Sequence, residues 1–213
     1  MNFCPRLIIL FSHAGKVRCL NKIFKKKTSS DLNESNISAN SHKVRFSDSE
    51  LVIYLYIVCY NEEFILPHLL KHYHFVKKIF IYDNGSTDNS LDIIKNDSRC
   101  EIINYSSKFN DEINKNIKNN CWKQHRLECD YCIVCDADEF IYHKSDLYTL
   151  LKVAKNRGIL YNYLPVIGIN MVSEDETFDN DIFLHEQINK GYPDKMYNKH
   201  IIFCPTLVQD MNF

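Results

Sequence analysis

The stretch Cys132-Ile-Val-Cys-Asp-Ala-Asp-Glu-Phe140 places three acidic residues directly after a short apolar run. Such a run is typical of a strand that is buried on both faces of a sheet. If the segment stays extended, Asp136 and Asp138 point the same way and can share one hard cation. A small divalent ion held by two carboxylates completes its shell with water and phosphate oxygens. The alternative is an acidic loop that caps a helix at residues 145–153.

Strands and helices alternate before this motif. Apolar, β-branched and aromatic residues predict strands at residues 51–59, 78–82 and 101–105. Apolar residues three or four positions apart predict helices at residues 66–75, 88–96 and 110–126. This order predicts an α/β fold, in which a mostly parallel, Rossmann-like sheet carries helices on both faces.

Polar residues follow three of these strands. They are Tyr60-Asn61-Glu62, Asp83 and the acidic motif at Asp136. Parallel sheets bind ligands at the carboxyl ends of their strands, where the strand order reverses. The sequence therefore predicts a site at this edge, although an Asx-turn followed by a Ser or Thr helix cap also accounts for the loop after Asp83.

Length and charge limit the organisation of the chain. The 213 residues fit one domain with a tail, and the net charge of −1 gives no reason to expect nucleic acid as a partner. Residues 1–50 are predicted to be a basic, flexible arm and linker, and residues 51–213 the folded domain. A basic amphipathic helix at residues 16–27 would suit an anionic membrane surface, with a solvated arm as the alternative. The apolar run at residues 7–11 is too short to span a bilayer.

The chain has nine cysteines, an odd number that cannot all pair within one chain, and most of them lie within apolar runs. This usage indicates a reducing compartment, so we expect a cytoplasmic protein, peripheral to a membrane if the arm binds one. Cys129, Cys132 and Cys135 have a spacing seen in metal sites, but in a strand Cys132 and Cys135 face opposite ways. We therefore expect buried, apolar cysteines.

Four motifs together resemble a known family. They are Tyr60-Asn61-Glu62-Glu63, ILPHLLKH at residues 65–72, IYDNGSTD at residues 81–88 and Asp136-Ala-Asp-Glu-Phe140, and in this order they look like family 2-type glycosyltransferases with the GT-A fold. The closest likeness is to the branch with an Asp-x-Asp-Glu-Phe motif. The resemblance covers residues 53–142, and weakly residues 192–205.

The resemblance implies a metal-dependent glycosyltransferase that moves a sugar from a nucleoside diphosphate donor to a hydroxyl acceptor, with inversion, in glycan or glycoconjugate assembly. It implies nucleotide contacts at Tyr60, Asn61, Glu62, Asp83 and Asp136. Mn²⁺ or Mg²⁺ would be held by Asp136 and Asp138. Glu139 would either support the metal or orient the backbone.

The acceptor half is less well defined. Asp175 is a weak candidate for the catalytic base, and His185 and His200 are further ones, although a lone histidine is more often structural. Similar enzymes continue beyond the segment that ends this chain, so residues 51–142 would be the nucleotide-binding half and 143–213 a partial, C-terminally truncated acceptor half. Two alternatives remain: a truncated or degenerate copy that only binds nucleotide, and a phosphohydrolase using the Asp-x-Asp pair.

Overall fold

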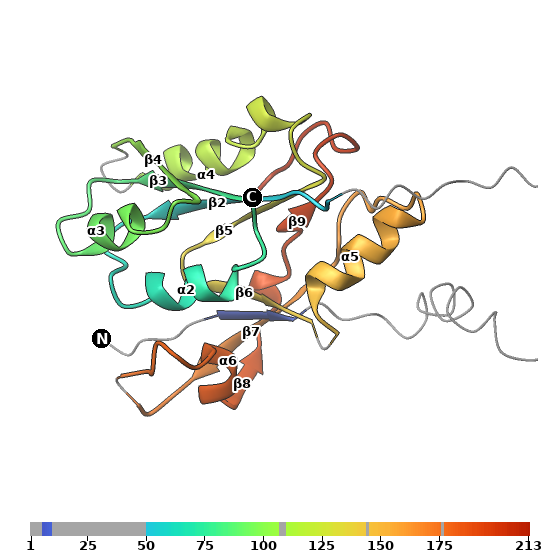
Figure 1. The fold of residues 1–213 in the computed structure, drawn as a ribbon. Coiled ribbons are helices and arrows are strands. Elements are labelled where there is room, and N and C mark those ends of the chain that lie inside the picture. The colour runs from blue at the N-terminus through green and yellow to red at the C-terminus, as the bar shows by residue number, and fades with distance from the viewer. Residues whose placement is uncertain (1–5, 10–49, 107–109, 144, 176) are drawn as a thin grey trace, which may run out of the picture.

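The computed structural model describes residues 6–9, 50–106, 110–143, 145–175 and 177–213. Its central sheet has the order β4-β3-β2-β5-β9. These strands are β2 (Ile53–Cys59), β3 (Lys78–Asp83), β4 (Cys100–Asn104), β5 (Tyr131–Asp136) and β9 (Ile202–Phe203). The first four are parallel, and β9 runs antiparallel to β5 (Figure 1). The predicted α/β fold with a mostly parallel sheet is confirmed.

Helices cover both faces of this sheet. They are α2 (Leu66–His72), α3 (Ser90–Lys95), α4 (Asp111–Asn120) and α5 (Leu147–Asn156). Helices α2, α3 and α5 contribute to one hydrophobic cluster, whereas the segment after α4 packs Trp122 on the other face. The described residues also form three short turns of helix, η1 (Lys123–His125), α6 (Leu184–Gln187) and η2 (Lys195–Tyr197).

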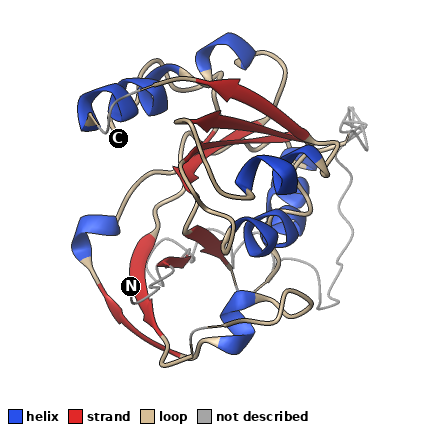
Figure 2. Ribbon diagram, turned by 90° about the vertical axis from the view of Figure 1, so that its left-hand side faces the viewer, coloured by secondary structure: helices blue, strands red, loops and turns tan. Residues whose placement is uncertain are grey.

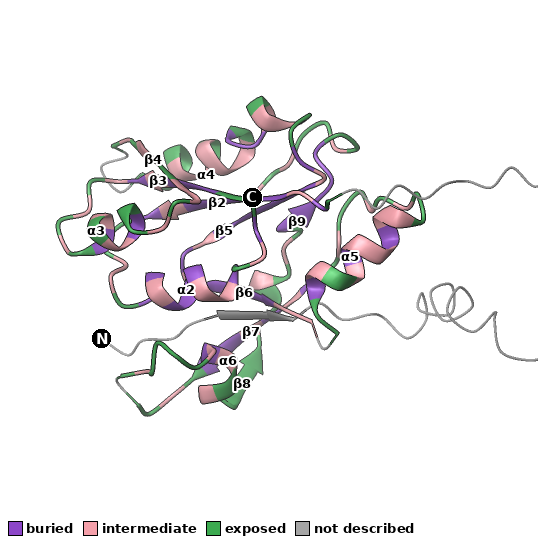
Figure 3. Ribbon diagram, viewed as in Figure 1, coloured by how far each residue is buried: buried purple, intermediate pink, exposed green. Residues whose placement is uncertain are grey.

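The alternation of side chains along β2 explains the two-sided core. Ile53, Leu55 and Ile57 belong to the cluster under α2, and Tyr54 and Tyr56 to the cluster under α4. All five are buried, so both faces of this central strand are removed from water (Figure 3). A nearly continuous apolar sequence is what such a strand requires.

A second sheet was not predicted. Its order is β6-β1-β7-β8, formed by β6 (Glu139–Tyr142), β1 (Arg6–Ile9), β7 (Ile167–Val172) and β8 (Lys190–Pro193). Figure 2 shows it beside the main sheet. Strand β1 pairs with β6 in parallel and with β7 in antiparallel orientation. The sequence predicts that Arg6–Ile9 belong to a flexible arm, but in the structure they form an inner strand of this sheet. Residues 10–49, which include the predicted membrane-binding helix, lie outside the described residues.

Several predicted boundaries move. The helix predicted at residues 110–126 ends at Asn120, and η1 follows it. The last predicted helix begins at Leu147, where the carboxylate of Asp146 accepts a hydrogen bond from Thr149 N at 2.9 Å. Asn89, and not a Ser or Thr, occupies the N-cap position of α3, and its side chain makes no capping hydrogen bond.

The cysteines behave as predicted. Among the described residues they are all free, and all are buried except the half-buried Cys100. Cys132 and Cys135 lie in different hydrophobic clusters, as opposite faces of a strand require. No helix in the described part of the chain is long and apolar enough to cross a membrane.

Candidate functional site

The site lies where the strand order of the main sheet reverses. Strand β2 is flanked by β3 on one side and by β5 on the other. The register pairs Val58 with Asp136 across one interface and Cys59 with Asp83 across the other. The three polar segments predicted from the sequence therefore emerge together at one edge of the sheet, the position at which α/β sheets bind ligands.

The loop after β2 is joined to the loop after β3. Asn61 adopts a left-handed backbone with φ of 54°, which asparagine tolerates better than most residues. Its N–H donates to Ser86 Oγ at 3.0 Å, and its Oδ1 accepts from Thr87 N at 2.7 Å. Glu62 N donates to Ser90 Oγ at 2.7 Å. The Asn61 side chain thus holds two loops in place, while the neighbouring Tyr60 ring is 38% exposed.

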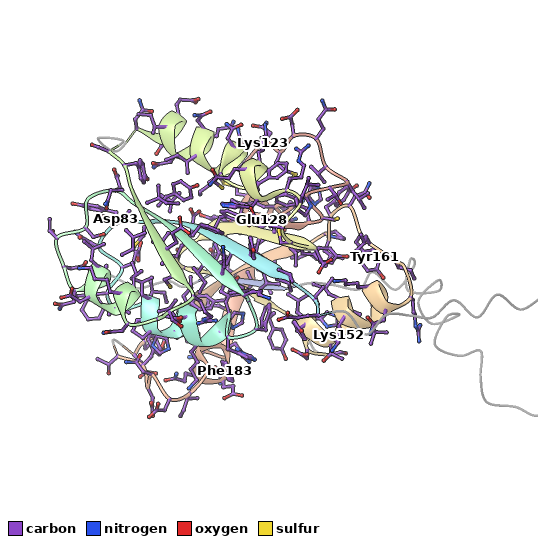
Figure 4. The ribbon with its side chains drawn as sticks, turned by 45° about the horizontal axis from the view of Figure 1, so that its top comes forward. Asp83, Lys123, Glu128, Lys152, Tyr161 and Phe183 are labelled. Atoms are coloured by element: carbon purple, nitrogen blue, oxygen red, sulfur yellow. The ribbon has the colours of Figure 1, made fainter. Side chains whose placement is uncertain are left out.

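Asp83 organises its own loop. Its side chain is 1% exposed, and its carboxylate accepts hydrogen bonds from Gly85 N at 3.0 Å and from Ser86 Oγ at 2.6 Å. Gly85 has φ of +82°, which explains glycine at this turn. The Asx-turn expected as an alternative is therefore present, and the nucleotide contact of Asp83 stays a prediction. Figure 4 places Asp83 at the left-hand edge of the sheet, well away from Tyr161.

Asp136 meets two lysines. Lys118 of α4 donates to Asp136 Oδ1, and Lys199 Nζ lies 3.6 Å from Asp136 Oδ2. By strand alternation Asp136 faces α4, with Cys132 and Val134, whereas Asp83 follows Ile81 onto the opposite face. The two predicted nucleotide contacts therefore approach the edge from different sides of the sheet.

Asp138 is not in an extended segment. Ala137 and Asp138 form a turn between β5 and β6, so the argument from strand alternation for Asp136 and Asp138 was wrong. Burial, followed by the charges of Asp138 and Asp136, raises the pKa of Glu62 to about 7. The charges of Asp138, in the turn, and Asp136, at the strand end, therefore both act on the carboxyl group of Glu62.

Glu139 orients the backbone of the motif. Its side chain is fully buried, with Oε2 accepting from Asp136 N at 3.1 Å and Oε1 accepting from Lys199 Nζ at 2.8 Å. Of the two roles considered for Glu139, these contacts match the orienting one. Lys199 neutralises a carboxylate that would otherwise be costly to bury.

The carboxylates of Glu62, Asp136 and Asp138, here called the acidic cluster, supply only part of the ligand shell of a cation. Among residues 6–9, 50–106, 110–143, 145–175 and 177–213, no group of three or more His, Cys, Asp or Glu side chains is arranged to hold a metal ion. Magnesium-like ions, however, often use one or two carboxylates and take their remaining ligands from water and substrate phosphates. Asp136 and Asp138 offer hard oxygen ligands of that kind, so the residues suit an ion completed by a phosphorylated ligand better than a cage made of protein alone.

The candidates for a catalytic base lie in other surroundings. Asp175 is exposed in the loop after β7, where its N–H donates to Ser173 Oγ at 3.0 Å. The ring of His185 packs 4.9 Å from Tyr142, and burial lowers its pKa. The exposed His200 ring lies 4.4 Å from that of Tyr163. None of these contacts involves Glu62, Asp136 or Asp138.

The sequence did not single out Lys118 or Lys199. Lys118 belongs to a polar helix in which lysines look like ordinary solvated residues, and Lys199 lies in a short segment before β9. Their side chains are nevertheless only 17% and 29% exposed. The position of Lys118 close to the apolar stripe of the helix was the available signal.

Comparison with known proteins gives a family. The model of glycosyl transferase family 2 matches residues 54–207, which include the loops after β2 and β3, the acidic motif and both lysines. Comparison with curated proteins finds no match. Enzymes of this family use nucleotide-sugar donors and, in general, glycan acceptors. Because the match spans most of the chain, the protein belongs to glycosyl transferase family 2 and is a glycosyltransferase.

Proposed function

We propose that this glycosyltransferase transfers a sugar from a nucleoside diphosphate donor to a hydroxyl acceptor with the help of Mn²⁺ or Mg²⁺, inverting the anomeric centre. The observation that carries the proposal is the position of the acidic motif beside the loops after β2 and β3, at the point where the strand order reverses. Membership of the family favours sugar transfer over the phosphohydrolase alternative.

Each residue has a proposed role toward the donor. Tyr60, which is 38% exposed, would stack its ring on the nucleobase. Asn61 and Asp83 keep the two loops in shape through their hydrogen bonds. Asp136 and Asp138 would hold the divalent ion, which supplies positive charge to the diphosphate as it leaves. The acceptor hydroxyl must lose its proton, and Asp175 remains only a weak candidate for that step.

Calorimetric titration tests the proposal. UDP and GDP are titrated into the full chain with and without Mn²⁺, and the experiment is repeated with Asp138→Ala. The expected result is nucleotide binding that Mn²⁺ strengthens, and the loss of that strengthening in Asp138→Ala. The matched control is Asp181→Ala, which removes an exposed carboxylate from a turn outside the cluster and should leave binding unchanged.

A folded chain that binds neither nucleotide under either condition would overturn the proposal. That outcome would favour a copy that has lost donor binding. Binding with Mn²⁺ that persists unchanged in Asp138→Ala would remove Asp138 from the metal site and leave nucleotide binding intact. Release of sugar from UDP- or GDP-linked donors, followed by product analysis, then tests transfer and inversion separately.

A further inference from the structure

Two lysines from distant parts of the chain converge on the acidic motif. Lys118 is in α4, and Lys199 precedes β9. Both approach Asp136, Lys118 through a hydrogen bond to Oδ1 and Lys199 at 3.6 Å from Oδ2. Lys199 also donates to Glu139 Oε1 at 2.8 Å. Two ammonium groups therefore stand at the place where the family's donor is expected.

Neutralising buried acid does not require both lysines. Of the two carboxylates, Glu139 is the fully buried one, and its ion pair with Lys199 already neutralises its charge. The side chain of Asp136 is 29% exposed and already has Lys199 nearby. Lys118 is thus a second cation on a carboxylate that water partly reaches, and holding a long side chain there costs conformational entropy.

Charge also limits what can bind beside these lysines. A divalent cation added at Asp136 would meet two ammonium groups and be repelled by them. A diphosphate carries several negative charges, and ammonium groups bind phosphate oxygens as point charges. An anion of this kind relieves the repulsion, because it offers the lysines and the cation a common partner.

We propose that Lys118 and Lys199 bind the diphosphate of the donor, and that in its absence they hold Asp136 in place as temporary counterions. The proposal rests on the proposed function of the site. When the donor arrives, the ammonium groups turn from Asp136 to the phosphate oxygens, and Asp136 becomes available to the divalent ion. Glu139 keeps the backbone of Asp136 fixed during this exchange through the 3.1 Å hydrogen bond from Asp136 N.

The wild-type chain gives the first test. In EDTA, the full chain should bind UDP or GDP more tightly than uridine or guanosine, because the lysines recognise the diphosphate without metal. Equal affinity for nucleoside and nucleoside diphosphate in EDTA would overturn the inference. This measurement needs no variant, so it is independent of any effect of substitution on folding.

Variants give the second test. Lys118→Gln and Lys199→Gln should each weaken nucleoside diphosphate binding by about tenfold to a hundredfold, the loss expected for a hydrogen bond to a charged group. Lys118→Arg should recover most of the affinity. Lys123→Gln is the control, because Lys123 lies in η1, just after α4, and forms a 2.5 Å ion pair with Asp210 and not with the acidic motif. Figure 4 shows Lys123 away from Asp83.

Mn²⁺ binding without nucleotide separates this role from a structural one. Measured by the electron paramagnetic resonance signal of free Mn²⁺, Lys118→Gln should bind the ion more tightly than wild type, because a competing cation is gone. If metal and nucleotide affinity fall together, the lysines only support Asp136 and the inference is wrong. If the two Lys→Gln variants bind nucleoside diphosphate as tightly as wild type, and Mn²⁺ still strengthens that binding, the inference is wrong and the proposed function stands. If the wild-type chain binds no nucleotide at all, both are wrong.

Discussion

The carboxyl group of Glu62 couples folding to pH. Its pKa is raised from 4.5 to about 7 by burial, then by the charges of Asp138 and Asp136. In the unfolded chain it ionises near 4.5, so between these values the folded state binds more protons. Stability is therefore expected to fall as pH rises from about 4.5 to about 7, and to stay reduced above that range.

Glu62→Gln removes this penalty. In the presence of EDTA, the variant should gain stability relative to wild type as pH is raised from 5 to 8, as measured by urea denaturation at each pH. Glu174→Gln is the control, because Glu174 is exposed and lies 3.6 Å from Lys190 in a surface pair of little energetic weight. A difference between Glu62→Gln and wild type that stays constant over this range would contradict the pKa assignment.

Helix α2 follows the loop after β2, and the carbonyl groups at its C-terminal end accept hydrogen bonds from Arg99, an arrangement called here the Arg99 clamp. Arg99 Nη1 donates to Tyr73 O at 2.7 Å, and Nη2 donates to Leu70 O at 3.0 Å. Asp97 holds the guanidinium with a 2.5 Å ion pair, and the hydrogen bond from Arg99 lowers the pKa of Asp97. The last carbonyls of a helix have no partner within the helix, so a clamp of this kind is stabilising.

Arg99→Met should lower the free energy of unfolding by about 1.5–3 kcal/mol, the usual contribution of hydrogen bonds to charged groups. Urea denaturation measures it. Lys95→Met is the matched control, since the Lys95–Asp92 pair is 3.4 Å apart and its side chains are 61% and 80% exposed. We expect the control to stay within about 0.5 kcal/mol of wild type. A loss in Arg99→Met no larger than in the control would show that the clamp is not needed.

The elements differ in how far sequence could predict them. The strands of the parallel sheet have apolar residues on both faces, and this pattern survives in the sequence. Strands β6 and β8 have four residues each, and β8 is exposed and ends in Pro193, so neither carries a pattern of its own. The lysines at Asp136 were equally hidden, because only the packing of α4 against β2 brings Lys118 to the strand end. Short strands and ion pairs of this kind depend on contacts between distant residues.

At the scale of the whole molecule, β1 pairs an N-terminal segment with two strands from the second half of the chain. Arg6–Ile9 pairs with β6, which begins at Glu139 of the acidic motif, and with β7 in the C-terminal part. All of β1 lies outside the segment matched by the family model. Without it, β6 and β7 would each lose a neighbour and expose unpaired backbone groups, which favour aggregation.

A chain lacking residues 1–49 should therefore be less stable in urea than the full chain and should form larger species in size-exclusion chromatography. The point variant Ile8→Pro should reproduce part of this loss, about 1–3 kcal/mol, because proline removes a backbone donor from an inner strand. Ile8→Val keeps that donor and should remain close to wild type. If the shortened chain and Ile8→Pro both match the full chain in urea midpoint and size, β1 contributes nothing to the fold. If they lose stability, the segment before the matched domain is part of the structure that supports β6, and through β6 it supports the turn that carries Asp138.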